Sequence, residues 1–336
     1  MAYTLSQIDQ HHFGGPEDVY VLDAHRTSPG LAAISSDQAL SLLDPTRLGA
    51  GPLASVATGH EAVTGLRVFD AAGGVVCTAG EDGCVAVWDL RQGARVARFA
   101  ASQGVSILSL ACNQETHTIA VGTELENHTA CVHIWDVRST PAQTAQYDSL
   151  HSDDITSLAF HPSTPHLLIS GSTDGLASIH DLRVADEDEL TVQTFNHDAS
   201  VHEAAFLSRG EVFALSHDER FRLYDAAEER VTGDAVQDFG DLRETLGCRY
   251  VAGVTTKRDG SGAIIGAGAQ DRQSFELVYM AKNQQTGLWD MHKDARVSLR
   301  GAHGGEVVRS FCCYDEEQVV FTTGEDGNIK AWRASS

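Results

Sequence analysis

The sequence has little positive charge, little proline and methionine, and no long apolar run. Its 336 residues include 24 Lys and Arg against 47 Asp and Glu, a formal net charge of −23. That charge repels nucleic-acid phosphates and anionic lipids, so we expect neither nucleic acid nor membrane as a direct partner. No apolar stretch approaches the roughly 18 residues that a membrane-spanning helix needs. The first residues lack the basic segment and apolar run of a secretory signal, which favours the cytoplasm or the nucleus.

Cysteine is also sparse and odd in number. The seven cysteines lie mostly inside apolar runs, a pattern typical of buried free thiols in a reducing compartment. The 31 glycines against 7 prolines and 3 methionines indicate many tight turns and few long helices. A hydrophobic content of 42% is enough to bury a core. Length alone, at roughly 150 residues per domain, would suggest two domains.

An internal repeat changes that estimate. Segments 76–89, 169–181 and 321–332 each contain an apolar run, small residues, a turn with Asp-Gly and an alternating strand. Weaker copies bring the closing aspartates to positions 44, 89, 136, 181 and 225, with steps of 45, 47, 45 and 44 residues. Asp-Gly favours the positive φ values of a tight hairpin, and further strands flank each hairpin. Four short strands in ~45 residues are typical of a propeller blade.

The ends of the repeats carry the dipeptides Gly59-His60, Trp88-Asp89 and Trp135-Asp136. On these residues the chain resembles the WD-repeat family over nearly its whole length. The resemblance implies an all-β fold, a single seven-bladed β-propeller of residues 1–336, with the N-terminal strand 3–8 completing the last blade. The expected blades are approximately 11–55, 56–100, 101–149, 150–196, 197–243, 244–301 and 302–336. In the irregular sixth blade, Trp289-Asp290 is expected to mimic the motif outside its usual place.

Family members build a buried hydrogen-bond relay in a blade from a His, a Ser or Thr, the turn Asp and the Trp. The resemblance places this relay at His60, Thr78, Asp82 and Trp88, at His303, Thr322, Asp326 and Trp332, and at His151, Ser170 and Asp174. The fourth blade carries His180 where Trp belongs, which puts its relay in doubt. Metal or acid–base chemistry is the alternative interpretation, but these residues recur with the blades. We therefore predict a non-enzyme without catalytic, cofactor-binding or metal-binding residues.

Arginine follows the closing aspartate by two positions in three repeats, at Arg91, Arg138 and Arg183. This Trp-Asp-x-Arg extension resembles the box of substrate receptors that dock on the adaptor of the cullin-4 RING ubiquitin ligase. A guanidinium at the rim can make a forked contact with a partner. The alternative is a solvated arginine that pairs with the neighbouring acid.

The surplus of acid is the second feature that the fold does not demand. Acidic residues cluster at Asp186, Glu187, Asp188 and Glu189, and again at Asp315-Glu316-Glu317. The resemblance extends to acidic propellers that escort basic clients such as histones and ribosomal proteins. A strongly negative surface would attract such clients. The alternative is that the charge only maintains solubility.

These features predict a non-catalytic protein-interaction scaffold, a monomeric propeller acting as an adaptor subunit of a larger complex. One alternative is a chaperone or assembly factor for a basic protein, as in ribosome biogenesis, with the client on an acidic face. Another is a cullin-4 ligase receptor that docks through its Trp-Asp-x-Arg motifs. Fold alone does not choose among them, because propellers have many functions.

Overall fold

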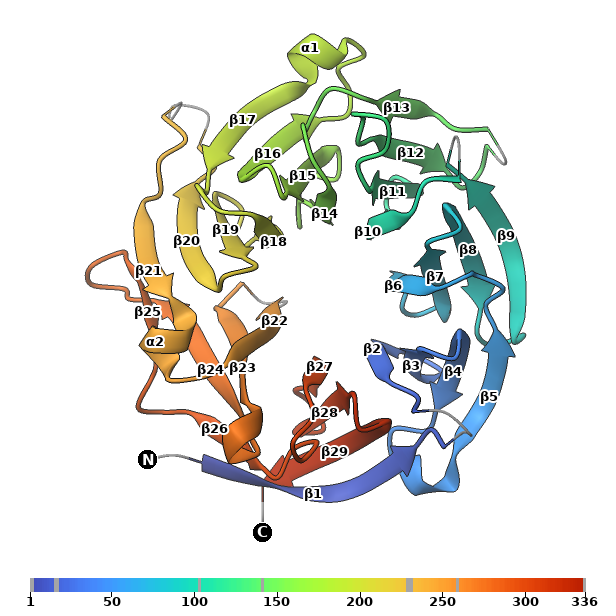
Figure 1. The fold of residues 1–336 in the computed structure, drawn as a ribbon, viewed down its shortest axis with the longest axis vertical. Coiled ribbons are helices and arrows are strands. Elements are labelled where there is room, and N and C mark those ends of the chain that lie inside the picture. Colours follow the sequence, from blue (N-terminus) through green and yellow to red (C-terminus); the bar gives the residue numbers. More distant parts are fainter. Residues whose placement is uncertain are drawn as a thin grey trace.

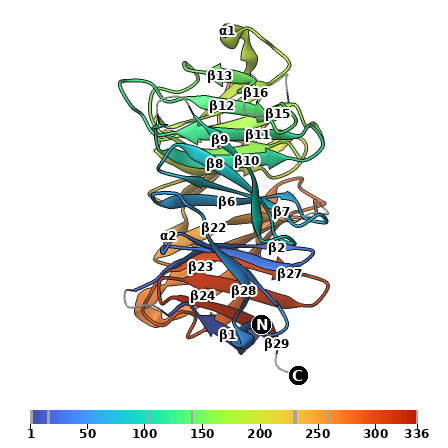
Figure 2. The same ribbon diagram turned by 90° about the vertical axis from the view of Figure 1, so that its right-hand side faces the viewer.

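The computed structural model describes residues 3–14, 18–101, 104–139, 142–227, 232–257 and 260–334. Seven blades surround a central channel, and the chain visits them in order around the ring (Figure 1). Turned by 90°, the molecule is a disc whose thickness is spanned by the strands (Figure 2). The predicted seven-bladed propeller is thereby confirmed.

The first five blades are separate four-stranded sheets. Blade 1 contains β2 (Val21–Thr27), β3 (Gly30–Ser35), β4 (Ala39–Leu43) and β5 (Pro52–Ala57). Blade 2 contains β6 (Val63–Asp70), β7 (Val75–Gly80), β8 (Cys84–Asp89) and β9 (Ala94–Ala100). Blade 3 contains β10 (Ile107–Asn113), β11 (Thr118–Thr123), β12 (Val132–Asp136) and β13 (Ala145–Tyr147). Blade 4 contains β14 (Ile155–Phe160), β15 (Leu167–Ser172), β16 (Leu176–Asp181) and β17 (Thr191–Asn196). Blade 5 contains β18 (Val201–Phe206), β19 (Glu211–Ser216), β20 (Arg220–Asp225) and β21 (Gln237–Asp241).

Blades 6 and 7 form one nine-stranded sheet because the N-terminal strand joins them. Blade 6 contains β22 (Tyr250–Thr256), β23 (Ala263–Ala269), β24 (Ser274–Lys282), β25 (Trp289–Met291) and β26 (Val297–Arg300). Blade 7 contains β27 (Val308–Tyr314), β28 (Val319–Gly324) and β29 (Asn328–Ala334). Strand β1 (Tyr3–His12) pairs antiparallel with β29 and parallel with β26. The expected ring closure is present, and β1 is longer than the strand 3–8 and also extends blade 6.

The helices are short. Those that lie wholly within the described residues are α1 (Glu187–Leu190), α2 (Leu242–Leu246) and the 3-10 turns η1 (Leu48–Ala50) and η3 (Gln270–Arg272). In the described part of the chain, no helix has the length and apolar character to cross a membrane.

Turn chemistry explains the hairpin between the second and third strands of a blade. In blade 2 the turn Glu81-Asp82-Gly83 places Gly83 at φ 66°, where a side chain is strained. A Cβ atom on Gly83 would also lie only 2.8 Å from the backbone carbonyl carbon of Gly104. The Asp-Gly pairs noted in the sequence thus mark turns that require glycine.

The core lies between neighbouring blades. In blade 2, all of β8 is buried, whereas the outermost strand β9 is mostly exposed. Phe99 packs with Trp135 of blade 3 at a ring-centroid distance of 5.9 Å, inside a cluster that also includes Ile107 and Val121. Apolar contacts of this kind, repeated around the ring, stabilise each blade through the next.

Candidate protein-interaction surfaces

The alternating strand directions assign every loop to one of two faces. The innermost strands all begin at one face, which also holds the turns between second and third strands; we call it the relay face, because the relay residues His60 and Asp82 lie there. The innermost and third strands end at the other face, which we call the arginine face, because Arg91, Arg138 and Arg183 follow those third strands.

Blade 2 contains a continuous chain of buried hydrogen bonds. The indole Nε1 of Trp88 donates to Thr78 Oγ1 at 3.0 Å, and Thr78 Oγ1 lies 2.9 Å from His60 Nε2. His60 Nδ1 lies 2.9 Å from Asp82 Oδ1. Because the Asp82 carboxylate only accepts, His60 donates to it from Nδ1–H, and in this neutral tautomer His60 Nε2 accepts from the Thr78 hydroxyl. These hydrogen bonds hold the turn that contains Asp82 against strands β7 and β8.

Blade 7 repeats this arrangement at His303, Thr322, Asp326 and Trp332. His303 lies 2.6 Å from Asp326 and 2.8 Å from Thr322, which accepts from Trp332 at 2.9 Å. The pKa of Asp326 lies well below its usual range because His303 and Lys330 hold its carboxylate.

In blade 4, His180 takes the role of the tryptophan. Its Nε2 lies 2.7 Å from Ser170 Oγ, and its Nδ1 lies 3.1 Å from Thr191 Oγ1. His151 lies 2.7 Å from Ser170 and 2.9 Å from Asp174. Burial and the neighbouring His151 lower the pKa of His180 to about 3, so it is neutral at pH 7. The hydrogen-bond chain is complete without a tryptophan.

The three motif arginines are exposed, and each pairs with the aspartate of its own motif. Arg138 Nη2 lies 2.6 Å from Asp136, Arg183 Nη2 lies 2.6 Å from Asp181, and Arg91 Nη2 lies 3.2 Å from Asp89. These hydrogen bonds lower the pKa of Asp136 and of Asp89 to about 2. The side chains of the three arginines remain 59–67% exposed, so solvent and partners reach them.

The acidic segment 186–189 forms the start of α1 on the outer rim, between blades 3 and 4 (Figure 1). Asp186 caps the helix by accepting from the backbone N–H of Asp188. Glu187 accepts from the N–H of Ser149, which follows the outermost strand of blade 3, at 2.7 Å. Part of this acidity therefore holds the helix in place.

The relay face shows a one-sided charge. Its described segments in blades 1–4 and 7 contain no Lys or Arg; they are 18–20, 36–38, 58–62, 81–83, 104–106, 124–131, 148–154, 173–175, 197–200, 301–307 and 325–327. Exposed acids on them are Asp18, Asp37, Glu61, Glu81, Glu124, Glu126, Asp148, Asp198 and Glu306. The arginine face, by contrast, mixes both signs. This asymmetry is not visible from net charge and follows from the loop assignment.

A ring of equivalent residues lines the channel. Each innermost strand has a register shift at the same point, and the residues after it are Asp23, Gly65, Ser109, Ser157, Glu203, Gly253 and Ser310. Several link to the next blade: Ser109 Oγ donates to Ile155 O at 2.7 Å, and Glu203 accepts from Val254 N–H at 3.1 Å. Burial raises the pKa of Glu203 to about 7. The sequence search missed this ring, although aligning the innermost strands would have revealed it.

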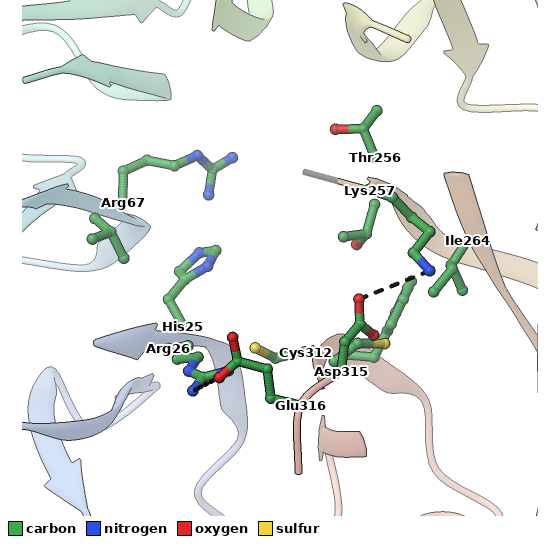
Figure 3. Close-up of a pocket in the computed structure, with 13 residues that line it drawn as sticks. His25, Arg26, Arg67, Thr256, Lys257, Ile264, Cys312, Asp315 and Glu316 are labelled. Atoms are coloured by element: carbon green, nitrogen blue, oxygen red, sulfur yellow. Dashed lines mark ion pairs between the residues drawn. The ribbon is translucent and has the colours of Figure 1, made fainter. Parts of the chain in front are cut away.

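At the arginine face the channel opens beside a cavity of about 540 Å³ between blades 1, 2, 6 and 7. In Figure 3, Arg67 extends toward Thr256 on the opposite wall, and Lys257 faces Asp315. Arg26 pairs with Glu317 at 2.7 Å, and its guanidinium lies 4.3 Å from the ring centroid of Tyr314. The acids 315–317 are therefore balanced by the nearby cations Arg26 and Lys257.

Comparison with known proteins finds similarity to WD-repeat proteins. The family model described as "WD domain, G-beta repeat" matches residues 51–89 and 145–181. An uncharacterized WD repeat-containing protein of Schizosaccharomyces pombe is 31% identical over 283 residues, covering 82% of this chain and 83% of that protein. The WD repeat-containing protein 89 homolog of Dictyostelium discoideum is 28% identical over 239 residues, covering 70% of this chain and 62% of that protein.

A guanine nucleotide-binding protein subunit beta-1 of Nicotiana tabacum is 31% identical over 115 residues, 33% of this chain and 30% of that protein. The relays, the ring of blades and the similarity to the fission-yeast protein over 82% of this chain all indicate the same family. The chain belongs to the WD-repeat family of β-propellers, which in general serve as scaffolds for protein interactions.

Proposed function

We propose that this propeller is a non-catalytic escort or adaptor that receives a basic segment of a partner protein on its relay face. The supporting observation is the absence of Lys and Arg from the described relay-face segments of blades 1–4 and 7, where acids such as Glu61, Glu81 and Glu306 are exposed. Such a surface attracts a cationic chain and accelerates its association. Histones and ribosomal proteins are clients of this chemistry.

In blades 2 and 7 the cationic side chains that reach the relay side come from strands and pair with turn carboxylates: Arg98 with Asp82, Arg309 with Glu325 and Lys330 with Asp326. At blades 5 and 6, by contrast, the relay-face segments themselves carry arginines. There, Arg243 pairs with Asp241 at 2.7 Å, and Arg249 pairs with Asp271 at 2.7 Å. We expect the client to follow the ring from blade 7 through blade 4 and to avoid this sector.

Charge reversal on one face at a time tests the proposal. A fluorescein-labelled octalysine peptide is titrated into the full chain at low and high salt. The relay-face variant Glu61→Lys, Glu81→Lys, Glu306→Lys should weaken binding about tenfold or more at low salt. The arginine-face control Glu115→Lys, Asp315→Lys, Glu316→Lys changes net charge equally and should weaken it much less. Equal losses would show that net charge acts without a preferred face, and the proposal would fail.

A cullin-4 ligase receptor is the second proposal, supported by three exposed guanidinium groups on one face in consecutive blades. Arg91, Arg138 and Arg183 follow the third strands of blades 2, 3 and 4. Replacing all three by alanine should abolish co-purification with the ligase adaptor and leave octalysine binding unchanged. Retained adaptor binding, or no adaptor binding by the original chain, would exclude docking by these arginines.

A further inference from the structure

Blade 3 contains a cavity of about 170 Å³ at the relay face. It lies between the turn that follows β11 and the end of the outermost strand. Its lining residues are Val105, Thr123, Glu126, Asn127, Thr129, Cys131, His133, Gln146 and Asp148.

Blade 3 also lacks the relay found in blades 2, 4 and 7. Val121 stands at the strand position of Thr78, since each lies opposite the residue two places before the blade's tryptophan. The Nε1 of Trp135 consequently has no hydrogen-bond partner among the described residues. The relay-face turn is also longer, with seven residues between Thr123 and Cys131 against three between Gly80 and Cys84.

The long turn is held in a defined shape. Glu126 and Thr129 exchange backbone hydrogen bonds of 2.9 and 3.0 Å, and the N–H of Leu125 donates to Asp154 of the next blade at 2.8 Å. The carboxylate of Glu126 is therefore presented by a braced turn.

His133 lines the cavity with an unsatisfied nitrogen. It is only 1% exposed, and its Nδ1 has no hydrogen-bond partner within the described residues. Its ring stacks on Trp135 at 5.7 Å, and burial lowers its pKa, which keeps it neutral at pH 7. A buried polar atom without a partner costs free energy, so a bound group that satisfies it gains affinity.

The charge of the cavity is negative. Glu126 and Asp148 are exposed carboxylates, and neither is paired with a Lys or Arg in the described part of the chain. Burial and Asp148 raise the pKa of the Cys131 thiol to about 12, so Cys131 is uncharged. The described residues contain no group of three or more His, Cys, Asp or Glu that could hold a metal ion. A positively charged side chain is the group that complements these two carboxylates.

Other blades show which group suits this place. In blade 2, Arg98 lies 2.5 Å from the turn carboxylate of Asp82; in blade 7, Lys330 lies 3.0 Å from Asp326. In blade 5, Arg222 lies 2.9 Å from Asp238. In blade 3 the same strand positions carry residues without positive charge: Gln146 corresponds to Arg98, and His133 corresponds to Lys330 and Arg222.

We propose that the blade-3 cavity receives one lysine or arginine side chain of the partner, which supplies between Glu126 and Asp148 the cation that blades 2, 5 and 7 supply internally. This inference rests on the proposed binding of a basic segment at the relay face, and it names the anchoring point of that segment. The cavity gives register to an interaction that charge alone would leave diffuse.

Two variants separate the anchor from the general field. Glu126→Gln with Asp148→Asn removes the cavity charges, and Glu81→Gln with Glu306→Gln is the control with the same charge change. Gln146→Arg places the guanidinium of blade 2 into blade 3, where it should fill the cavity from within. Thr194→Arg at the matching position of blade 4 is its control.

Fluorescein-labelled octalysine and octaarginine are titrated into each full-length variant at one salt concentration, and ¹⁵N signals of the His133 ring are followed with each peptide. We expect both cavity variants to bind about tenfold more weakly than their controls, and the His133 signals to shift only in the original chain and the controls. The peptide with the larger effect identifies lysine or arginine as the anchor.

Equal affinities of cavity variants and controls, with strong binding by the original chain, would overturn the anchor and leave the proposed function intact. Failure of the original chain to bind either peptide at low salt would overturn both.

Discussion

His180 Nε2 lies 2.7 Å from Ser170 Oγ, so a histidine completes in blade 4 the relay that a tryptophan completes in blades 2 and 7. Ser170 is thus the shared partner of two buried imidazoles, those of His151 and His180. The Ser170 hydroxyl therefore connects the two buried imidazoles in the polar core of the blade.

Replacing Ser170 by alanine should destabilise the protein by about 3 kcal/mol, because it leaves two buried imidazole nitrogens without partners. Ser178→Ala is the control in the same blade, since among the described residues the Ser178 hydroxyl has one hydrogen-bond partner, the exposed Thr194. It should cost about 1 kcal/mol. Urea unfolding followed by tryptophan fluorescence measures both. Equal losses would mean that Ser170 does not hold the relay together.

Acid should destabilise the protein partly through His180. Its folded pKa is about 3, below the value of about 6.5 in an unfolded chain, so below about pH 6.5 the unfolded state binds more protons. The free energy of unfolding should therefore fall by about 1.4 kcal/mol per pH unit from this group between about pH 6 and pH 4. His180→Trp, or His180→Gln if the larger ring does not fit, should flatten the slope by that amount in urea titrations at successive pH values. An unchanged slope would contradict a neutral buried His180.

Glu203 should act in the opposite direction. Its pKa of about 7 in the channel lies above that of an exposed carboxyl, so the folded state holds a proton that the unfolded state has lost. Stability from this group is present in acid and is lost as the pH rises through about 7. Glu203→Gln should raise the thermal midpoint at pH 8 relative to the original chain and change it little at pH 5. If the thermal midpoint of the variant differed from that of the original chain by the same amount at pH 5 and pH 8, Glu203 would be ionised at both pH values.

Removing residues 1–12 should open the ring. Strand β1 pairs with both β29 and β26, and Leu5 packs in the apolar cluster between blades 6 and 7. The deletion leaves two unpaired strand edges, which favour unfolding and aggregation. We expect a clearly lower thermal midpoint and partial recovery when a synthetic peptide of residues 1–12 is added. A scrambled peptide is the control, and an unchanged midpoint would show that β1 does not close the ring.

The repeat spacing together with the family resemblance was enough to predict seven blades, because most copies of the turn and closing strand form a local pattern. Asp82-Gly83 illustrates this: the dipeptide alone specifies a positive-φ turn. Blade 6 lacks that pattern. Trp289-Asp290 was expected to mimic the motif, and it lies in the short strand β25, where Trp289 Nε1 has no partner among the described residues. The relay residues could be placed from the family pattern, but the doubt about His180 could not be resolved without its partner Thr191.

Local sequence therefore set the number of blades, the turns and the surplus of acid, since these depend on neighbouring residues and on composition. The tertiary structure decided which acids share a face. Successive loops of an antiparallel blade lie on opposite faces, so loops far apart in sequence come together on the same face. The tertiary structure also brought together Glu126, His133 and Asp148, whose types and spacing carry no recognisable motif. Composition gives only the net charge of −23; the fold places exposed acids on one face and forms the cavity in blade 3.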